Sequence, residues 1–197
     1  MSPLFNRYYD TIMKPLETKS FHPIRESLLA RARGTVLEIG SGTGINFPLY
    51  RSPDKVVAIE PDSVMLTRSL QRAEQSAVPV EVVQAGAERL PFEANRFDSV
   101  VCTLVLCTIP DPLAALAEIR RVCKPGGTLL LFEHVLLEHP IWNAVQQGLT
   151  PAWKKMCGGC HLNRNSLAFV QQAGFQIVHL EWKYKKLFLV AEARNGK

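Results

Sequence analysis

The sequence lacks long hydrophobic runs, and this absence excludes several classes of protein. No stretch reaches the ~20 apolar residues that a membrane-spanning helix needs, and the first residues do not form a charged and then apolar secretory leader. No internal repeat, low-complexity tract or Gly/Ser-rich linker divides the chain. With 197 residues, 47% of them hydrophobic and 21% charged, the composition predicts one globular, cytoplasmic domain.

The chain has few cysteines and an odd number of them, which argues against a disulfide framework in a protein without an export signal. The five cysteines are Cys102, Cys107, Cys123, Cys157 and Cys160. Cys157 and Cys160 form a C-x-x-C pair beside His161, but a structural zinc site needs about four ligands and no second C-x-x-C or H-x-x-x-H occurs. We therefore predict no metal here. Cys102 and Cys107 are expected on the fourth strand as small core residues.

The net charge is +5, but the basic residues are not concentrated in one segment as they are in many nucleic-acid-binding proteins. A basic stripe with interleaved aromatics would indicate RNA, and only residues 182–186 faintly approach one. We therefore do not expect nucleic acid as a partner. Trp142 and Trp153, with Lys154 and Lys155 beside the second, are equally compatible with a peripheral contact on an anionic membrane surface. No sequence feature calls for an obligate protein partner.

The segment VLEIGSGTG, residues 36–44, joins an apolar strand to three alternating glycines. Gly40, Gly42 and Gly44 allow a tight turn that a ligand can approach closely. A dinucleotide-binding loop would have its third glycine at position 45, where Ile45 stands, and the Lys-Ser/Thr pair of a phosphate-binding loop is missing. The segment predicts a nucleotide-cofactor loop, with nicotinamide and flavin disfavoured.

Further strands and helices alternate after this loop, as in a doubly wound α/β fold. Glu60 ends the second predicted strand, where such folds place the acid that binds ribose hydroxyls, while Asp62 fits a helix start equally well. The short turn between the last two strands requires antiparallel pairing. The predicted strands lie at 55–60, 80–84, 96–109, 128–132, 175–184 and 187–193, and a helix at 113–123 is closed by Lys124-Pro125-Gly126-Gly127.

These motifs resemble the class I S-adenosylmethionine-dependent methyltransferases with a methyltransferase type 11 domain. VLEIGSGTG, VVAIEPD, AGAERLPF, RFDSVVCTLVL and EIRRVCKPGGTLLLFEH occur in that family's order and spacing. VCTLVLCTI, residues 151–154 and GCHLNR at residues 159–164 are most similar to its small thiol S-methyltransferases.

The resemblance implies a single domain over residues 1–197. It would have cap helices in 1–34, a cofactor-binding core in 35–133, and substrate-side helices with the last two strands in 134–197. The fold would be a Rossmann-like doubly wound seven-stranded sheet, mostly parallel with an antiparallel final strand. Its successive parallel strands would contain Val36, Val56, Val80, Val100 and Leu129.

The resemblance also implies S-adenosyl-L-methionine as the methyl donor, with S-adenosyl-L-homocysteine as the product. The glycine-loop backbone would hold the methionine portion, Glu60 the ribose, and Ala87 and Glu88 the adenine edge. The full set of expected cofactor residues is Tyr9, Glu38, Gly40, Ser41, Gly42, Gly44, Asn46, Glu60, Pro61, Met65, Ala87, Glu88, Thr103 and Leu104.

The acceptor is expected to be a small molecule, with a thiol favoured by the resemblance. A thiol has a pKa near ~8.5, so a nearby base or cation would raise its reactive fraction. His134 is our first candidate for a catalytic residue, and His134, His161 and Arg164 are candidates for substrate contact. N-methylation of a phospholipid, C-methylation of a quinone precursor, and cofactor binding without catalysis remain open.

Overall fold

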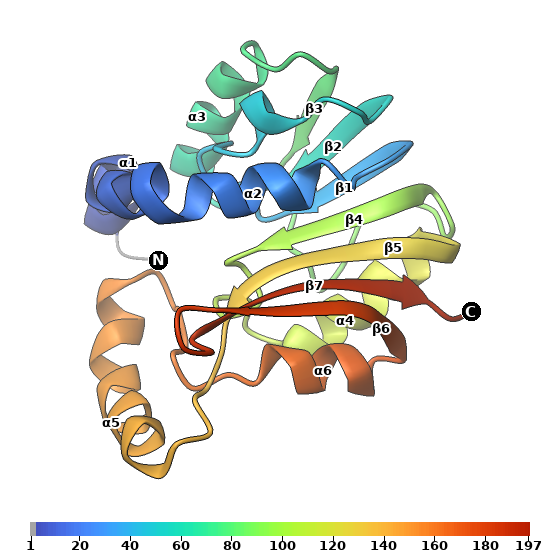
Figure 1. Cartoon of the computed structure of the whole chain (residues 1–197). Helices are drawn as coiled ribbons and strands as arrows, with labels where there is room; N and C mark the ends of the chain where they lie inside the picture. Colours follow the sequence, from blue (N-terminus) through green and yellow to red (C-terminus); the bar gives the residue numbers. More distant parts are fainter. Residues whose placement is uncertain (1–2) are drawn as a thin grey trace.

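The computed structural model describes residues 3–197 and, among the first twelve side chains, those of Tyr8, Asp10 and Thr11. A seven-stranded sheet has the order β3-β2-β1-β4-β5-β7-β6 (Figure 1). The first five strands are parallel, and β7 runs antiparallel between β5 and β6. The predicted fold class is therefore confirmed. The strands are β1 (Thr35–Ile39), β2 (Lys55–Ile59), β3 (Val80–Val83), β4 (Phe97–Thr103), β5 (Cys123–His134), β6 (Phe175–Lys183) and β7 (Phe188–Asn195).

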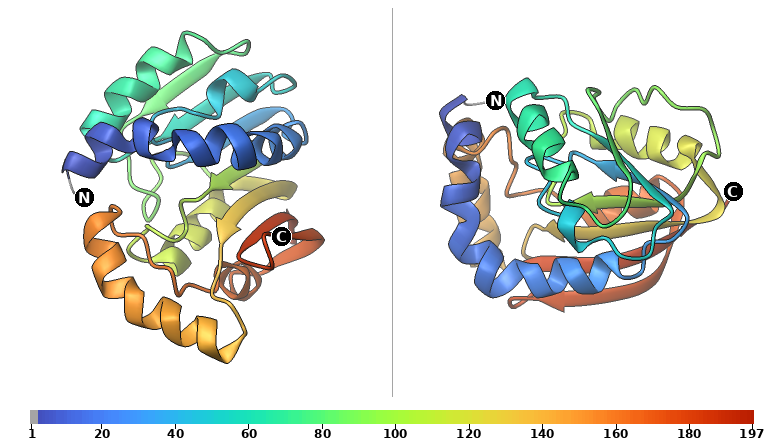
Figure 2. Two further views of the ribbon diagram at one scale, coloured as in Figure 1. Left: turned by 60° about the vertical axis from the view of Figure 1, so that its left-hand side comes forward. Right: turned by 90° about the horizontal axis from the view of Figure 1, so that it is seen from above.

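Helices cover both faces of this sheet and one end of it (Figure 2). α2 packs on one face, and α4 and α6 pack on the other. α1 and α5 lie beyond the carboxyl ends of the parallel strands (Figure 1). The helices are α1 (Pro3–Leu16), the π-helical turn η1 (Glu17–Phe21), α2 (His22–Leu29), the 3-10 turn η2 (Phe47–Leu49), α3 (Ser63–Ala73), α4 (Pro112–Val122), α5 (Pro140–Met156) and α6 (Ser166–Gln172).

Strand alternation divides the apolar side chains into two cores. Successive residues of a strand face opposite sides of the sheet, so Val36 packs toward α2 while Leu37 packs toward α4. The same holds in β5, where Leu130 and Leu131 belong to different cores. Burial of both faces explains why these strands are continuous apolar runs.

The fourth strand is shorter than the sequence predicts, because β4 ends at Thr103. Leu104 has a φ of 54°, in the left-handed region that a β-strand does not use. Residues 105–108 then form a turn closed by Thr108 N donating to Val105 O at 2.9 Å. The prediction that Cys107 lies on this strand was wrong, whereas Cys102 is a fully buried strand residue as expected.

The KPGG segment also differs from its prediction, because α4 ends before it and β5 already begins at Cys123. The pairing with β4 shifts between Cys123 and Thr128, so the segment is an irregularity inside the strand rather than a helix-closing turn. The Asn195 side chain, at the end of β7, donates to Cys123 O and Lys124 O at 2.9 and 3.2 Å. These bonds join the irregular segment to the last strand.

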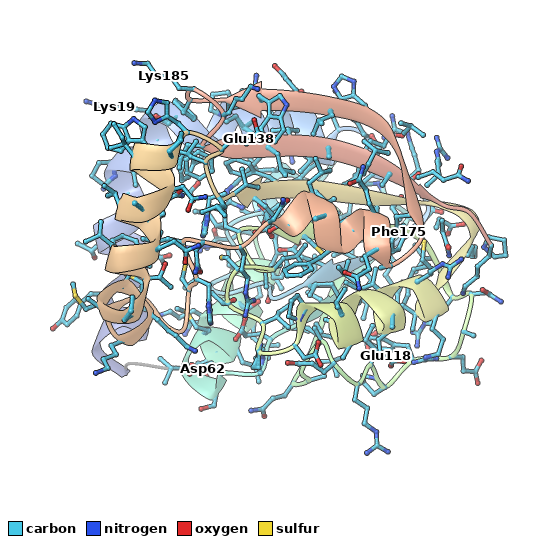
Figure 3. All side chains as sticks on the ribbon, turned by 90° about the horizontal axis from the view of Figure 1, so that it is seen from below. Lys19, Asp62, Glu118, Glu138, Phe175 and Lys185 are labelled. Atoms are coloured by element: carbon cyan, nitrogen blue, oxygen red, sulfur yellow. The ribbon has the colours of Figure 1, made fainter. Side chains whose placement is uncertain are left out.

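The first turns of two helices are capped by aspartates. Asp62 accepts from Val64 N and Met65 N at the start of α3 (Figure 3), and Asp111 does the same at the start of α4. Asp62 thus has the helix-start role that the sequence allowed. Within residues 3–197, no helix has both the length and the apolar character needed to cross a bilayer.

Candidate functional site

A cavity of about 1270 Å³ lies at the carboxyl ends of the parallel strands. Open α/β sheets bind ligands at this edge, and the volume exceeds the ~300–1,000 Å³ of a typical small-molecule site. Most of the expected cofactor residues line it: Gly40, Ser41, Gly42, Asn46, Glu60, Pro61, Met65, Ala87, Glu88, Thr103 and Leu104. We call this part of the wall the donor end.

Three expected cofactor residues are not on this wall. Gly44 lies behind it, where an added Cβ would meet the Phe47 ring at 2.8 Å. Glu38 is buried within β1 and contacts the wall residue Asn46. The side chain of Tyr9 lies outside the described part of the structure.

The glycine loop presents bare backbone to the cavity. Gly40 has a φ of 63°, and a Cβ there would stand 2.3 Å from Val105 Cγ2. Gly42 has a φ of 56° and nothing within 4 Å of the position where its Cβ would be. Both backbone conformations favour glycine. The packing at Gly40 and the open space at Gly42 show why the loop needs glycine and how a ligand can approach it.

Glu60 links the second strand to this loop. Its Oε2 accepts from Gly42 N at 2.9 Å, and its Oε1 accepts from Asp62 N at 2.9 Å. Burial raises the pKa of the carboxyl, and the two backbone N–H groups act in the opposite direction. The glycine loop and the end of the second strand are therefore in contact, and backbone N–H groups fix the Glu60 carboxyl at the cavity wall.

Glu38 accepts buried hydrogen bonds from two side chains, one on the wall and one behind it. Its Oε1 accepts from Asn46 Nδ2 at 3.0 Å, and its Oε2 accepts from the Tyr50 hydroxyl at 2.7 Å. Burial raises the pKa of Glu38 to about 7, against the lowering effect of the Tyr50 and Asn46 hydrogen bonds and of the Arg25 charge. This carboxyl supports the wall instead of facing the cavity.

Arg25 of α2 completes the network. Its guanidinium donates to both carboxylate oxygens of Glu17, at 3.0 and 2.9 Å. It also donates to Asn46 Oδ1 and Thr103 Oγ1. Sequence reasoning missed Arg25, Glu17 and Tyr50, because no short motif pairs helix residues with strand ends so far along the chain.

The turn after β4 is held by a second buried acid. Glu133 Oε1 accepts from Val105 N and Leu106 N at 2.8 and 2.9 Å, and Leu104 N donates to Phe132 O at 2.7 Å. Burial raises the pKa of Glu133 to about 7. Its Oε2 is buried without a partner among the described residues.

The amino-terminal helix reaches the glycine loop through Asp10. Asp10 accepts from the Thr43 hydroxyl at 2.7 Å and from Arg72 of α3 at 3.0 Å. Arg72 also donates to Thr43 O and Oγ1. These bonds hold α1 beside the donor end.

The opposite part of the wall, which we call the acceptor end, comes from the β4–α4 turn, the last part of α5 and the segment after it. It contains Thr108, Ile109, Pro110, Pro151, Lys154, Lys155, Cys157, Gly158, Gly159, His161 and Arg164. His161 and Arg164 therefore lie where the sequence predicts. Arg164 is held there because its guanidinium donates to Leu106 O and Ile109 O, both at 2.5 Å.

His134 lies beneath this wall and not on it. Its side chain is 9% exposed, and its Nε2 is 3.1 Å from Cys160 Sγ. Burial alone would lower the pKa of His134, but the hydrogen bond and charge of Cys160 outweigh it and raise the pKa. Hydrogen bonding from Cys107, then that from His134, lowers the pKa of Cys160 to about 4 in spite of burial. The pair favours a thiolate beside an imidazolium.

Cys107 belongs to the same cluster. The ligand-type atoms of Cys107, His134 and Cys160 all lie within 4.8 Å of one another. Sequence reasoning missed this cluster, because its members are separated by more than 20 residues and come from three different segments. The C-x-x-C spacing pointed instead to Cys157 and Cys160.

Comparisons with known proteins agree with this geometry. Residues 37–131 match the family described as a methyltransferase domain. The chain is 32% identical to thiol S-methyltransferase TMT1B of Rattus norvegicus, over 92% of this chain and 80% of the relative. The chain belongs to the S-adenosylmethionine-dependent methyltransferases.

Two further comparisons place the methyltransferase more broadly. It is 34% identical to a phosphatidylethanolamine N-methyltransferase of Cereibacter sphaeroides, over 59% of this chain and 58% of that one. A solved S-adenosylmethionine-dependent methyltransferase from Thermotoga maritima, described as a possible histamine N-methyltransferase, superposes with a TM-score of 0.68. That comparison covers 97% of each chain at 20% identity and supports the fold alone.

The donor end fits the cofactor of this methyltransferase. Gly42 leaves its backbone open to a ligand, and Glu60 places a fixed carboxyl on the same wall. S-adenosylmethionine supplies an electrophilic methyl group on a sulfonium sulfur. The contacts of individual residues with it stay predictions, as does a catalytic role of His134.

Proposed function

We propose that this methyltransferase transfers the methyl group of S-adenosylmethionine to the sulfur of a small thiol. The relative named for thiol S-methylation aligns over 92% of the chain, which includes the acceptor end. The relative named for phospholipid N-methylation aligns over only 59%. The longer match supports a thiol acceptor.

The charge of the acceptor end carries the proposal. Lys154, Lys155 and Arg164 line it, whereas the acids that the described residues contribute to the cavity wall, Glu60 and Glu88, lie at the donor end. Cations stabilise a thiolate and lower the pKa of the thiol that forms it. They also repel a protonated amine. The acceptor end therefore favours binding of a thiol in its reactive form.

The chain contributes mainly by positioning. The glycine loop and Glu60 hold the donor, and the wall from Cys157 to His161 excludes water from the acceptor. The thiolate attacks the methyl carbon, so a new S–C bond forms while the sulfonium S–C bond breaks. Alignment of two reactants can supply several powers of ten in rate.

Product analysis tests the acceptor class. Purified protein would be given donor with a deuterated methyl group and, separately, a small thiol, phosphatidylethanolamine or a quinone precursor. We expect label in a thioether and none in the other two products. Label in the lipid or the quinone would overturn the thiol assignment, and tight donor binding without label anywhere would favour a non-catalytic protein.

A lysine variant tests the electrostatic step. Lys154→Met should lower kcat/KM for the thiol about tenfold at neutral pH. It should also shift the rise of the pH profile of kcat upward, because the bound thiol loses a stabilising cation. Lys185→Met, in the turn between β6 and β7, is the matched control outside the cavity wall. An unchanged pH profile for Lys154→Met would contradict the proposed role of the cations.

We also propose that α5 contacts an anionic membrane surface while the protein stays in the cytoplasm. Ile141, Trp142, Leu149 and Met156 project from this helix with 67, 57, 54 and 64% of their surfaces exposed. Lys154 and Lys155 are in its last turn, and such a combination suits an interfacial helix. A lipid surface beside the cavity would supply apolar thiols, and it would also suit the rival phospholipid acceptor.

A further inference from the structure

Three soft metal-ligand side chains meet beneath the acceptor end. Cys107 comes from the turn after β4, His134 from the end of β5, and Cys160 from the segment after α5. Cys107 and His134 are buried and Cys160 is partly buried. Two thiols and an imidazole are the donor set that zinc prefers.

The spacing of these atoms matches that donor set. His134 Nε2 and Cys160 Sγ are 3.1 Å apart, and no two ligand atoms of the group are more than 4.8 Å apart. Zn–S bonds of ~2.3 Å and Zn–N bonds of ~2.0 Å in a tetrahedron separate neighbouring ligand atoms by about 3.5–3.8 Å. Small side-chain adjustments would bring all three atoms to that separation.

The cluster lies directly behind the acceptor end of the cavity. Gly159 and His161 flank Cys160, and Thr108 follows Cys107; all three line the acceptor end. His161 N donates to Cys107 O at 2.9 Å, which ties the two cysteine segments together. Among the residues that the structure describes, the group has no fourth His, Cys, Asp or Glu. Structural zinc sites use four protein ligands, and catalytic sites use three and keep one position open.

Within the described part of the chain, two side-chain atoms of the neighbouring residues Glu133 and His134 are buried without partners. His134 Nδ1 and the adjacent Glu133 Oε2 are buried and make no hydrogen bond among the described residues. Such groups cost free energy unless a bound molecule or ion offsets it. His134 Nδ1 belongs to the same ring as the ligand atom Nε2, and Glu133 precedes His134 in β5.

We propose that Cys107, His134 and Cys160 bind a zinc ion whose fourth position accepts the sulfur of the acceptor thiol. This role in methyl transfer rests on the proposed function. The thiol would lose its proton to solvent as its sulfur coordinates zinc. The coordinated thiolate would then form a bond with the methyl carbon as the sulfonium S–C bond breaks, and the neutral thioether would leave the metal.

This site differs from the one considered from the sequence. The sequence predicts no metal site, with only Cys157, Cys160 and His161 considered as possible ligands and Cys107 as a core residue. The structure instead brings Cys160 together with Cys107 and His134. Cys157 is not in the group although it belongs to the same C-x-x-C pair. The two cysteines of that pair therefore provide a matched test.

The first experiment measures metal binding without any acceptor. Untagged protein, kept reduced with a phosphine, would be stripped of metal and titrated with Co²⁺, whose thiolate charge-transfer and tetrahedral ligand-field absorption report coordination. We expect one equivalent of Co²⁺, displaced by Zn²⁺. Cys160→Ser and His134→Ala should weaken binding by at least about tenfold, because each removes one of three ligands, and Cys157→Ser should bind as the wild type does.

The outcomes separate the metal site from folding and from the proposed function. Circular dichroism and thermal unfolding show whether each variant is folded. Because Cys160 is partly exposed and Cys107 is buried, Cys160→Ser changes the packing less than Cys107→Ala would. Absence of cobalt absorption in the wild type, or equal loss in Cys157→Ser and Cys160→Ser, would overturn the site.

Activity tests the role of the ion. Zinc-loaded protein should methylate a thiol at least about tenfold faster than stripped protein, while calorimetry shows the same affinity for S-adenosylhomocysteine in both. Equal rates would overturn the acceptor role. Stoichiometric metal with no thiol methylation would refute the thiol function and leave the metal site intact.

Discussion

The donor and acceptor ends of the cavity are built in opposite ways. At the donor end, backbone N–H groups from Gly42 and Asp62 satisfy both oxygens of Glu60, and a network of side-chain hydrogen bonds supports Asn46. Beneath the acceptor end, two thiols and an imidazole lie within 4.8 Å of one another. The hydrogen bonds of the donor end are formed before any ligand binds, whereas the acceptor end, as we propose, still needs a metal ion.

This difference suits the two substrates. A methyltransferase family keeps one donor, so the wall that binds it can be fixed in backbone geometry. Acceptors differ between members, so their recognition rests on side chains from loops, which change without disturbing the sheet. Mutations at the two ends should therefore have effects of different size and kind.

Gly40→Ala should give the largest effect. A Cβ there would stand 2.3 Å from Val105 Cγ2, on a backbone with a φ of 63°. Overpacking and the left-handed backbone together cost about 3 kcal/mol if the loop keeps its shape. A loop that moves to relieve this strain no longer fits the donor, so we expect up to about a 100-fold loss of affinity for S-adenosylhomocysteine in calorimetry. Gly126→Ala has a similar φ of 68° with nothing within 4 Å, and its affinity should not change. Equal affinities in the two variants would show that donor binding does not depend on the backbone conformation at Gly40.

Glu38→Gln should change how stability depends on pH. Burial raises the pKa of Glu38 from 4.5 to about 7 in the folded protein. Because the folded carboxyl keeps a proton that the unfolded one loses, the free energy of unfolding of the wild type should fall by about 2–3 kcal/mol as pH rises through this window.

The variant cannot ionise at this position, so urea unfolding between about pH 5 and about pH 8 should show a shallower fall than in the wild type. Glu133, whose pKa burial also raises to about 7, remains in both proteins and keeps part of the slope. Identical slopes would mean that Glu38 stays ionised in the folded state.

Glu60→Gln tests the fixed acid at the donor end with little change of shape. Hydrogen bonds to a charged group contribute about 1.5–3 kcal/mol, so we expect affinity for S-adenosylmethionine to fall about tenfold or somewhat more. Asp62→Ala is the control: it removes the cap of α3, which costs about 1 kcal/mol of stability, and leaves the Glu60 carboxyl in place. A larger loss of affinity in Asp62→Ala than in Glu60→Gln would show that Glu60 is not the acid that contacts the donor.

Leu149→Glu should have the smallest effect, at the outer surface of the acceptor end. Loss of one inserted leucine on α5, replaced by an anionic side chain, predicts about a tenfold weaker partition onto vesicles of phosphatidylserine and phosphatidylcholine. Leu70→Glu on α3 is matched in residue type and exposure, 49% against 54%, and should bind vesicles like the wild type. Equal vesicle binding by both variants would contradict the proposal that α5 contacts the membrane.

The same contrast explains what could be predicted from the sequence. The alternation of strands and helices, the glycine loop and the place of Glu60 after the second strand followed from patterns within short segments, because strand burial and tight turns constrain adjacent residues. The end of β4 did not, since the apolar run continues through Leu104 into a buried turn. Apolar character alone cannot distinguish a strand from the turn that follows it.

The cysteine cluster could not be predicted for another reason. Cys107, His134 and Cys160 come together only through the packing of three segments, and their spacing along the chain has no periodicity. Arg25 was missed in the same way, because its partners Asn46 and Thr103 lie in later segments. Short motifs predict local geometry, and these contacts are long-range.

The position of β7 has a consequence for how the chain folds during synthesis. This strand lies between β5 and β6, and its Phe188 pairs with His134. On the ribosome, β1 to β5 and the glycine loop emerge well before Phe188–Asn195. The nascent chain can therefore assemble its donor end early, whereas the sheet beside His134 closes only after β7 has left the ribosome. Long-range pairing of this kind is slow to form, and a translation pause would leave the edge of β5 exposed to chaperones.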